Sequence, residues 1–205
     1  MTISIIGTGN MARGIATRMI AGSHNVELHA HNLTKGEALA TELGKNAKAV
    51  AVGSELHDIV VLAIPYDAIS DVANQYDNFA GKTVIDITNP IDFATFQLIP
   101  EAGTSGAEAI AKSLPDAHVI KAFNTTLAGT LAAGEAGGFP LDVFIAGDDT
   151  AAKQAIAELV RDGGMRPIDT GALQNARHLE GIQLIHMATQ DQLGGGWMSA
   201  ITFVK

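Results

Sequence analysis

Residues 2–12 read Thr-Ile-Ser-Ile-Ile-Gly-Thr-Gly-Asn-Met-Ala, and this stretch decides the fold. The isoleucines predict a buried strand, the two glycines a tight turn, and the residues after them a helix. Gly7 permits a turn that a β-carbon would obstruct, Gly9 lets the backbone approach a diphosphate, and Ala12 lets helix and strand pack closely. The stretch therefore predicts a dinucleotide site where the first strand turns into the first helix.

The start of that helix presents unpaired N–H groups and the positive end of the helix dipole to phosphate groups. We therefore expect Gly7, Thr8, Gly9, Asn10 and Met11 to contact the cofactor. A glycine pair alone is a weak signal, but here a strand precedes it and a helix and a second strand follow. The alternative is an ordinary glycine-rich turn in an α/β protein.

The bulk composition is that of a globular domain, with 205 residues, 47% of them hydrophobic and 17% charged. The chain has no cysteine, which excludes disulfides and thiolate metal sites and is compatible with the cytoplasm, where we expect the protein. The first strand begins at residue 2, so we expect no signal peptide. Apolar runs are only strand-length, so we expect no membrane partner.

The net charge of −9 disfavours nucleic acid as a partner, because phosphate backbones require a basic surface. It does not exclude a dinucleotide, for which local N–H groups and one or two cations suffice. Seven histidines raise the question of a metal, but apart from Glu180 neither His29 with His31 nor His178 with His186 has a carboxylate at suitable spacing. We therefore expect no metal site.

Strand and helix patterns alternate along the chain, which predicts an α/β protein with a Rossmann-type, doubly wound and mostly parallel sheet. We expect a single domain over residues 1–205, with a C-terminal helix and tail over about 172–205. Residues 88–103 and 124–140 show no clear pattern. The predicted strands are 2–6, 26–30, 47–50, 59–64, 84–87, 119–123, 143–146 and 166–169, and the predicted helices are 10–21, 34–44, 65–76, 105–113, 150–161 and 172–190.

The residues at the end of the second strand indicate whether the protein binds NAD or NADP. NAD sites usually carry Asp or Glu there to hold the ribose 2′-hydroxyl, but this sequence reads Ala-His-Asn-Leu-Thr-Lys over residues 30–35. Asn32 and Thr34 can donate hydrogen bonds and Lys35 can supply positive charge, so we predict that these residues, with His31, bind NADP. The alternative is that Asn32 and Thr34 only cap the next helix.

Three later loops follow central strands and should meet the cofactor at the same edge of the sheet. Ile64, Pro65 and Tyr66 end one strand, and Asn89 follows another, where it can bond a ribose hydroxyl or the carboxamide. Asn89 can also be a simple turn residue before a proline. Ala122, with the phenylalanine after it, can form an apolar wall for the nicotinamide, or both can be core residues.

The order of several motifs resembles one family, the NADPH-dependent reductases of the deazaflavin coenzyme F420, and the reductase domain of membrane ferric reductases is similar. The resemblance covers nearly the whole chain. The motifs are Gly-Thr-Gly-Asn-Met-Ala at 7–12, Asp-Ile-Thr-Asn-Pro at 86–90, Val-Ile-Lys-Ala-Phe-Asn-Thr at 119–125, Ala-Gly-Asp-Asp at 146–149, Pro-Ile-Asp-Thr-Gly at 167–171 and Ala-Arg-His-Leu-Glu at 176–180.

The resemblance implies a Rossmann fold with a small C-terminal extension, and NADP bound at residues 7–11 and after the second strand. It implies direct hydride transfer to a second planar compound without an essential side-chain acid or base. Asn32 occupies the position of the family's phosphate-binding serine, and Leu33 and Thr34 replace the arginines that follow it.

These observations favour a cytoplasmic NADP-dependent oxidoreductase that uses a small-molecule electron acceptor of flavin, deazaflavin or other type. We predict no catalytic side chain, because hydride transfer is the chemistry of the cofactor itself. We also predict a site lined by apolar residues, including Trp197 or Met198. A homodimer is compatible with the sequence. One alternative is a non-catalytic NADP(H)-binding redox sensor. Another is an imine reductase of the pyrroline-5-carboxylate type, which needs a large helical domain that this chain lacks.

Overall fold

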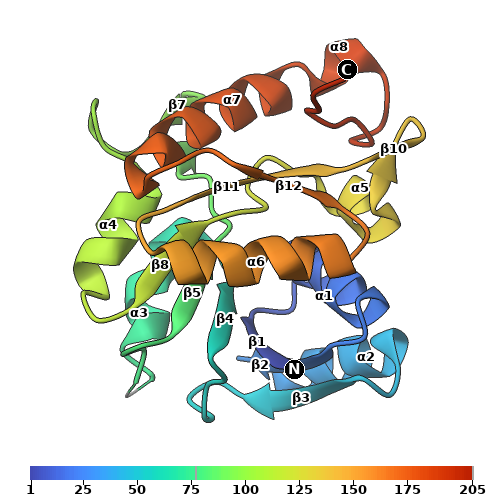
Figure 1. The fold of residues 1–205 in the computed structure, drawn as a ribbon, viewed down its shortest axis with the longest axis vertical. Helices are drawn as coiled ribbons and strands as arrows, with labels where there is room; N and C mark the ends of the chain where they lie inside the picture. Colours follow the sequence, from blue (N-terminus) through green and yellow to red (C-terminus); the bar gives the residue numbers. More distant parts are fainter. Residues whose placement is uncertain (77, 205) are drawn as a thin grey trace.

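A central sheet organises the computed structural model, which describes residues 1–76 and 78–204 (Figure 1). Its strands lie in the order β12-β11-β8-β5-β4-β1-β2-β3, and the six from β8 to β3 are parallel. The order reverses between β1 and β4, which is where ligands of such sheets bind. The strands are β1 (Thr2–Ile6), β2 (Asn25–Ala30), β3 (Ala47–Ala51), β4 (Ile59–Leu62), β5 (Thr83–Asp86), β8 (His118–Lys121), β11 (Asp142–Gly147) and β12 (Arg166–Asp169).

The last two strands run the other way, because β11 pairs antiparallel with β8 and β12 pairs parallel with β11. Between β8 and β11 the chain forms helix α5 (Ala128–Ala133) and the hairpin of β9 (Glu135–Ala136) and β10 (Phe139–Pro140). This connection leads the chain into β11 at the same edge of the sheet at which β8 ends. Strand β11 therefore runs in the direction opposite to that of β8. The predicted α/β class and mostly parallel sheet are confirmed.

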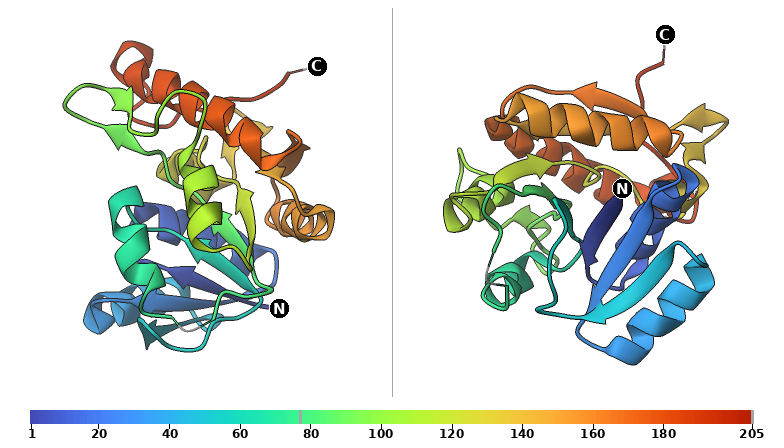
Figure 2. Two further views of the ribbon diagram at one scale, coloured as in Figure 1. Left: turned by 90° about the vertical axis from the view of Figure 1, so that its left-hand side faces the viewer. Right: turned by 60° about the horizontal axis from the view of Figure 1, so that its bottom comes forward.

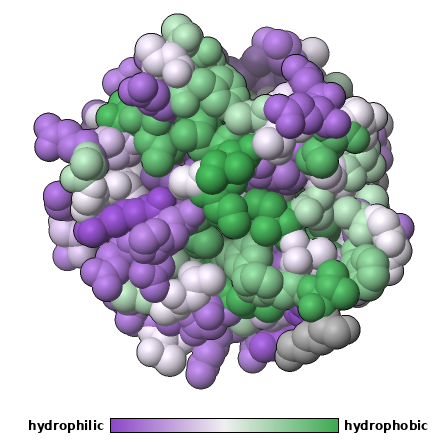
Figure 3. Space-filling model, turned by 90° about the horizontal axis from the view of Figure 1, so that it is seen from above, coloured by the Kyte–Doolittle hydropathy of each residue, from purple (hydrophilic) through white to green (hydrophobic). Residues whose placement is uncertain are grey.

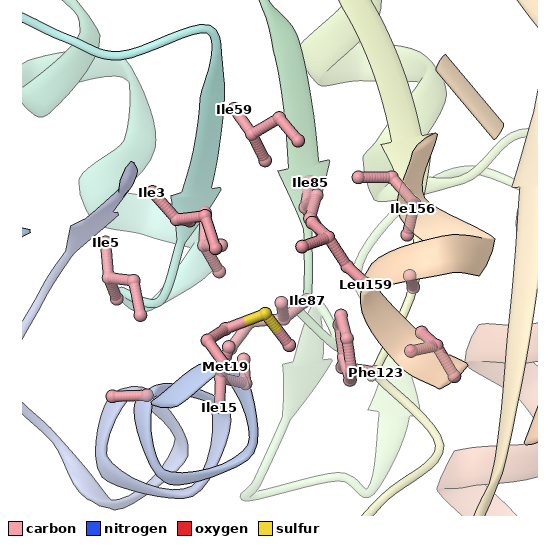
Figure 4. Close-up of a cluster of buried hydrophobic side chains, with 14 of the residues drawn as sticks. Ile3, Ile5, Ile15, Met19, Ile59, Ile85, Ile87, Phe123, Ile156 and Leu159 are labelled. Atoms are coloured by element: carbon pink, nitrogen blue, oxygen red, sulfur yellow. The ribbon is translucent and has the colours of Figure 1, made fainter. Parts of the chain in front are cut away.

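Helices cover both faces of the sheet and create two buried cores. Helices α1 (Asn10–Ala21), α2 (Leu33–Leu43) and α6 (Thr150–Asp162) pack on one face, and Figure 4 shows part of that core, where Ile3, Ile85 and Ile156 point toward one another. Helices α3 (Ile69–Ala73) and α4 (Gly106–Ser113) cover the other face. Burial of these apolar side chains, at about 25 cal/mol per Å², drives folding.

The C-terminal part lies across one end of the molecule (Figures 1 and 2). Helix α7 (Ala176–Ala188) packs against α4 and against a hairpin of β6 (Ile91–Asp92) and β7 (Gln97–Leu98). This hairpin occupies part of the stretch 88–103, for which the sequence showed no pattern. A two-residue strand is too short for alternation to be visible.

Two predicted helices are wrong in extent. Residues 65–76 contain a 3-10 turn (Tyr66–Ala68) and then only the short α3, and the side chain of Gln75 donates to the carbonyl of Asp71 at the end of this helix. The predicted helix 172–190 divides into a 3-10 turn (Leu173–Asn175), α7 and α8 (Gln190–Leu193). The Thr189 hydroxyl donates to the carbonyls of Ile185 and His186, which interrupts the helix there.

One polar cluster fills the face of the sheet beside β2, where the chain passes from β3 to β4 without a helix. The His29 ring is fully buried, with Nε2 3.1 Å from Ser4 Oγ and the ring 5.7 Å from that of Tyr76. Glu27 lies beside it and pairs with the exposed Lys48. His31 follows the strand and is exposed, so it does not share the buried position of His29.

Candidate functional site

The turn after β1 is shaped by glycine. Gly7 has φ +121°, and a β-carbon there would collide with the carbonyl oxygen of Ala63, which follows β4. Its N–H donates to His29 O at 3.1 Å, which joins the turn to β2 as well. The turn is therefore packed against both neighbouring strands, at the point where the strand order reverses.

The start of α1 has no side-chain cap. Gly9 is its N-cap residue, in an extended conformation, and a β-carbon on Gly9 would meet no protein atom within 4 Å. By contrast, Asn32, Ser105 and Asp149 cap α2, α4 and α6 with their side chains. Within residues 1–76 and 78–204, no side chain caps the first N–H groups of α1, and this fits the phosphates of a dinucleotide.

The segment after β2 lies beside this turn, and the β-carbon position of Gly36 in α2 is 3.8 Å from Thr8 Cγ2. His31, Asn32, Thr34 and Lys35 are all exposed there. Asn32 Oδ1 accepts a hydrogen bond from Lys35 N at 3.1 Å, so the capping interpretation of Asn32 is confirmed. The capping bond uses only the amide oxygen, and its Nδ2 group keeps its donor capacity.

The loops after β5 and β8 are joined by a reciprocal pair of asparagines. Asn89 Nδ2 donates to Asn124 O and Asn124 Nδ2 donates to Asn89 Oδ1, each at 2.9 Å. Asn124 Nδ2 also donates to Leu179 O of α7 at 3.0 Å. Asn89 is therefore held by a defined partner rather than being only a turn residue. The sequence did not single out Asn124.

Three buried polar atoms in these two loops lack a hydrogen-bond partner within the described residues, namely Thr88 Oγ1, Asn124 Oδ1 and Thr125 Oγ1. Native proteins rarely leave buried polar atoms unpaired. Phe123, between these residues, has φ +64°, a conformation that costs a non-glycine residue about 1–3 kcal/mol and clusters at functional sites. A polar ligand group at this edge would fit the unpaired atoms.

The side chains of Ala122 and Phe123 fit the alternative that both are core residues, and contact of Ala122 with the cofactor stays a prediction. Ala122 and Phe123 are buried in the core on the α1 side of the sheet. Ile64 and Tyr66 are half-buried and Pro65 is exposed after the end of β4, and their contact with the cofactor stays a prediction.

An aromatic cavity of about 470 Å³ lies between the β6–β7 hairpin and α7. Phe93 and Phe96 line it from the hairpin, Met187, Ala188 and Asp191 from the helical end, and Trp197 from the tail. Of these six residues, the sequence singled out only Trp197. The hairpin that carries Phe93 and Phe96 begins directly after Asn89-Pro90, so part of the cavity lining follows Asn89 closely in the sequence.

A buried charge cluster supports the same edge of the sheet and was also missed. Lys121 Nζ lies 2.8 Å from Asp86 Oδ2, 2.7 Å from Glu180 Oε1 and 2.6 Å from Thr88 O, and all three charged side chains are buried. Burial, and then the carboxylates of Glu180 and Asp86, raise the pKa of Tyr66. A lysine inside the apolar run 119–123 suggests a buried cation, but the sequence does not show which carboxylates it pairs with.

An uncapped helix start at the reversal point of a doubly wound sheet defines a dinucleotide-binding protein of the Rossmann type. The comparisons with known proteins narrow this class to NADP-dependent reductases. A family model described as "NADP oxidoreductase coenzyme F420-dependent" matches residues 2–90. Residues 2–90 therefore match a family of NADP-dependent reductases, and the prediction of NADP as the cofactor is confirmed. The individual residues that bind it remain predictions.

Relatives match well beyond those residues. Metalloreductase STEAP3 of Rattus norvegicus is 32% identical over 183 residues, which are 89% of this chain and 36% of that protein, so the chain spans about a third of its relative. The F420-dependent NADP reductase of Methanothermobacter marburgensis is 28% identical over 200 residues and 89% of each chain. The structure of a candidate F420-dependent NADP reductase from Arthrobacter sp. FB24 aligns over 99% of each chain with a TM-score of 0.85 and 25% identity.

Within residues 1–76 and 78–204, no helix has the length and apolar character needed to cross a membrane.

Proposed function

We propose that this protein transfers hydride between NADP(H) and a small planar acceptor of the flavin or deazaflavin kind. The observation that carries the proposal is the aromatic cavity of about 470 Å³ between α7 and the β6–β7 hairpin, which follows the loop after β5 in the sequence. Aromatic side chains offer flat apolar surfaces on which a planar ring can stack. The names of the Methanothermobacter and Arthrobacter relatives support a deazaflavin, and those of the STEAP relatives support transfer of electrons toward a metal.

The cofactor would lie across the carboxyl ends of the strands. The free N–H groups after Gly9, with Thr8, Asn10 and Met11, would hold the diphosphate, and Asn32, Thr34 and Lys35 would hold the 2′-phosphate. Asn89 and the turn 64–66 would then border the nicotinamide. We also keep the cytoplasm as the proposed compartment, because the 205 residues contain no cysteine.

NADPH supplies the hydride when it is bound, so the chain's own residues need only orient the two rings and exclude water. Such orientation can contribute about 7–11 kcal/mol to lowering the barrier. Tyr66 is the titratable side chain at the end of β4, and the raised pKa of its phenol keeps it protonated at neutral pH. It would therefore serve as a hydrogen-bond donor and not as a base.

Stopped-flow oxidation of bound NADPH by FMN, a deazaflavin, a quinone and a ferric chelate tests the proposal. Phe93→Ala and Trp197→Ala should each lower kcat/KM for the preferred acceptor by about 5- to 30-fold, since each removes roughly 1–2 kcal/mol of ring contact. Phe139→Ala removes an aromatic ring that is about as exposed as that of Trp197 but does not line the cavity, and should leave turnover unchanged. No oxidation by any acceptor would favour the redox sensor instead.

A further inference from the structure

A buried cluster of three charged side chains lies at the carboxyl ends of β5 and β8. Asp86 is the last residue of β5 and Lys121 the last residue of β8, and the two are register partners in the sheet. Glu180 of α7 contacts the same ammonium group. The three side chains are at most 1% exposed, so water does not screen their charges as it does at the surface.

Both carboxylates carry their negative charge, because each of their oxygens accepts a hydrogen bond from a nitrogen atom. Asp86 Oδ1 accepts from Thr88 N and Oδ2 from Lys121 Nζ, each at 2.8 Å. Glu180 Oε1 accepts from Lys121 Nζ at 2.7 Å, and Oε2 accepts from Gly106 N at 3.1 Å. A protonated carboxyl group would turn one of these oxygens into a donor and break such a bond.

The cluster is not neutral, since two carboxylates share one ammonium group. In the part of the chain that the structure describes, no second cation pairs with Asp86 or Glu180. Arg177 of α7 and Glu108 of α4 pair with each other and add no net charge. The positive end of α4 at Gly106 offsets about half a charge, so the cluster keeps an excess of about half a negative charge.

The cluster adjoins the two loops that border the nicotinamide in the proposed function. Lys121 Nζ lies 2.6 Å from the carbonyl oxygen of Thr88, the residue before Asn89. The Thr88 hydroxyl is buried and has no hydrogen-bond partner among the described residues. Asn89 follows Asp86 by three residues, so their Cα atoms are at most about 10 Å apart. Strand β4 pairs with β5 as far as Asp86, so the turn 64–66 also starts beside the cluster.

Tyr66, in the turn after β4, responds to the excess charge. Its Cε2 atom lies 3.1 Å from the β-carbon position of Gly106, whose N–H donates to Glu180. Burial is the largest cause of the raised pKa of Tyr66, followed by the charges of Glu180 and Asp86. The opposing effect of Lys121 is smaller than either. The cluster therefore acts on the end of β4 as a negative charge.

The surroundings of the cluster favour the reach of this charge. Helix α7 carries no Asp, Glu, Lys or Arg beyond Glu180. Figure 3 shows apolar residues gathered on the end of the molecule where α7 lies. Inside a protein, charges interact at an effective dielectric constant of about 20, roughly four times as strongly as in water. A ring within about 10 Å of the cluster would therefore experience its charge.

We propose that the excess negative charge of Asp86, Lys121 and Glu180 makes the protein bind NADP⁺ more tightly relative to NADPH, and so makes bound NADPH a stronger reductant. The inference rests on the proposed function, which places the nicotinamide at this edge. When a hydride ion passes to the acceptor, its two electrons reduce the acceptor and the nicotinamide ring gains a positive charge. The cluster stabilises that positive ring and leaves the neutral ring of NADPH unaffected. It therefore favours reduction of the acceptor over reduction of NADP⁺.

Calorimetric titration of the full chain with NADP⁺ and with NADPH, without an acceptor, tests the proposal. Glu180→Gln keeps the size of the side chain and removes its charge. It should raise the ratio of the NADP⁺ to the NADPH dissociation constant by about 10-fold, as expected for one charge about 10 Å from the ring. The potential of the bound nucleotide then rises by about 30 mV. Asp86→Asn should act in the same direction, and Glu158→Gln, on the exposed side of α6, should leave the ratio within about 2-fold of the wild-type value.

Glu180→Asp separates the effect of charge from that of shape. It keeps the charge and shortens the side chain, so it should keep the wild-type ratio even where both nucleotides bind more weakly. Circular dichroism checks that each variant folds. If Glu180→Gln and Asp86→Asn bind both nucleotides with an unchanged ratio, or if Glu180→Asp shifts the ratio as much as Glu180→Gln, the inference is overturned and the proposed function stands. A wild-type protein that binds neither nucleotide would overturn both.

Discussion

Lys121 Nζ lies 2.7 Å from Glu180 Oε1, and this buried contact joins strand β8 to helix α7. The same carboxylate accepts hydrogen bonds from the backbone N–H groups of Gly106 and Ala107 at the start of α4. On the opposite side Lys121 pairs with Asp86 of β5 at 2.8 Å. One ammonium group therefore fixes the sheet, α4 and α7 relative to one another beneath the candidate site.

Replacing Lys121 by methionine should lower the free energy of unfolding by about 3–5 kcal/mol, because two carboxylates would remain buried without a cation. Urea denaturation at pH 7.5 measures this loss. Lys153→Met is the matched control, since Lys153 pairs with Asp169, whose side chain is 62% exposed, and its loss should cost less than about 1 kcal/mol. Equal losses for the two variants would contradict the view that Lys121 organises the site.

Substitution of Gly7 should affect the stability of the protein, whereas substitution of Gly9 should affect the binding of NADPH. Gly7→Ala should destabilise the protein by more than about 2 kcal/mol, because the β-carbon meets Ala63 O at a positive φ. Gly9→Val should change stability by less than about 1 kcal/mol, because its side chain enters open space, yet it should abolish NADPH binding by occupying the diphosphate position. Calorimetric titration and thermal denaturation of both variants give the comparison. NADPH binding by Gly9→Val would place the diphosphate elsewhere.

The sequence predicts the fold well where local pattern and burial agree. The run after Met1 specifies β1, the glycine turn and α1 together, since each part needs the next for its hydrogen bonds and packing. The hydrophobic pattern does not predict the structure where contacts between residues distant in the sequence determine it. β11 reads as any other buried strand, and its antiparallel direction follows from the path of residues 124–140, which local periodicity does not encode.

In the candidate site too, features set by local sequence can be predicted and features set by tertiary contacts cannot. Backbone features such as the uncapped α1 can be inferred from glycine spacing, because glycine has specific conformational roles. The Asn89–Asn124 pair and the Lys121 cluster join residues 35 or more positions apart, and a single sequence carries no signal for such pairs. Phe93 and Phe96 lie in a hairpin too short to be predicted, so the aromatic cavity could be found only in the structure.

Lys35 tests the predicted preference for NADP. Lys35→Glu should weaken binding of NADP by about 1.5–3 kcal/mol and of NAD much less, since only NADP brings a 2′-phosphate to this segment. Lys45→Glu makes the same charge change at an exposed position beyond the end of α2 and should not discriminate between the two nucleotides. Fluorescence titration with NADPH and NADH measures both. Equal weakening of both nucleotides by Lys35→Glu would show that Lys35 does not contact the phosphate.

His29 should make folding sensitive to mild acid. Burial lowers the pKa of His29 to about 4, and the neighbouring Glu27 carboxylate opposes this shift only in part, while His57 and Lys48 add to it. An unfolded histidine has a pKa of about 6.5, so between these values the unfolded chain binds a proton that the folded chain does not. The stability provided by neutral His29 is complete above pH 6.5 and is lost as the pH falls toward 4.

From pH 7.5 to pH 5.0 this loss is about 2 kcal/mol, at 1.36 kcal/mol per pKa unit. His29→Gln removes the titrating group, so its free energy of unfolding should fall by about 2 kcal/mol less over the same interval than that of the wild-type protein. His178→Gln, at an exposed position of α7, should behave as the wild type does. Urea denaturation at the two pH values gives the comparison, and an unchanged pH dependence in His29→Gln would mean that the acid sensitivity arises elsewhere in the chain.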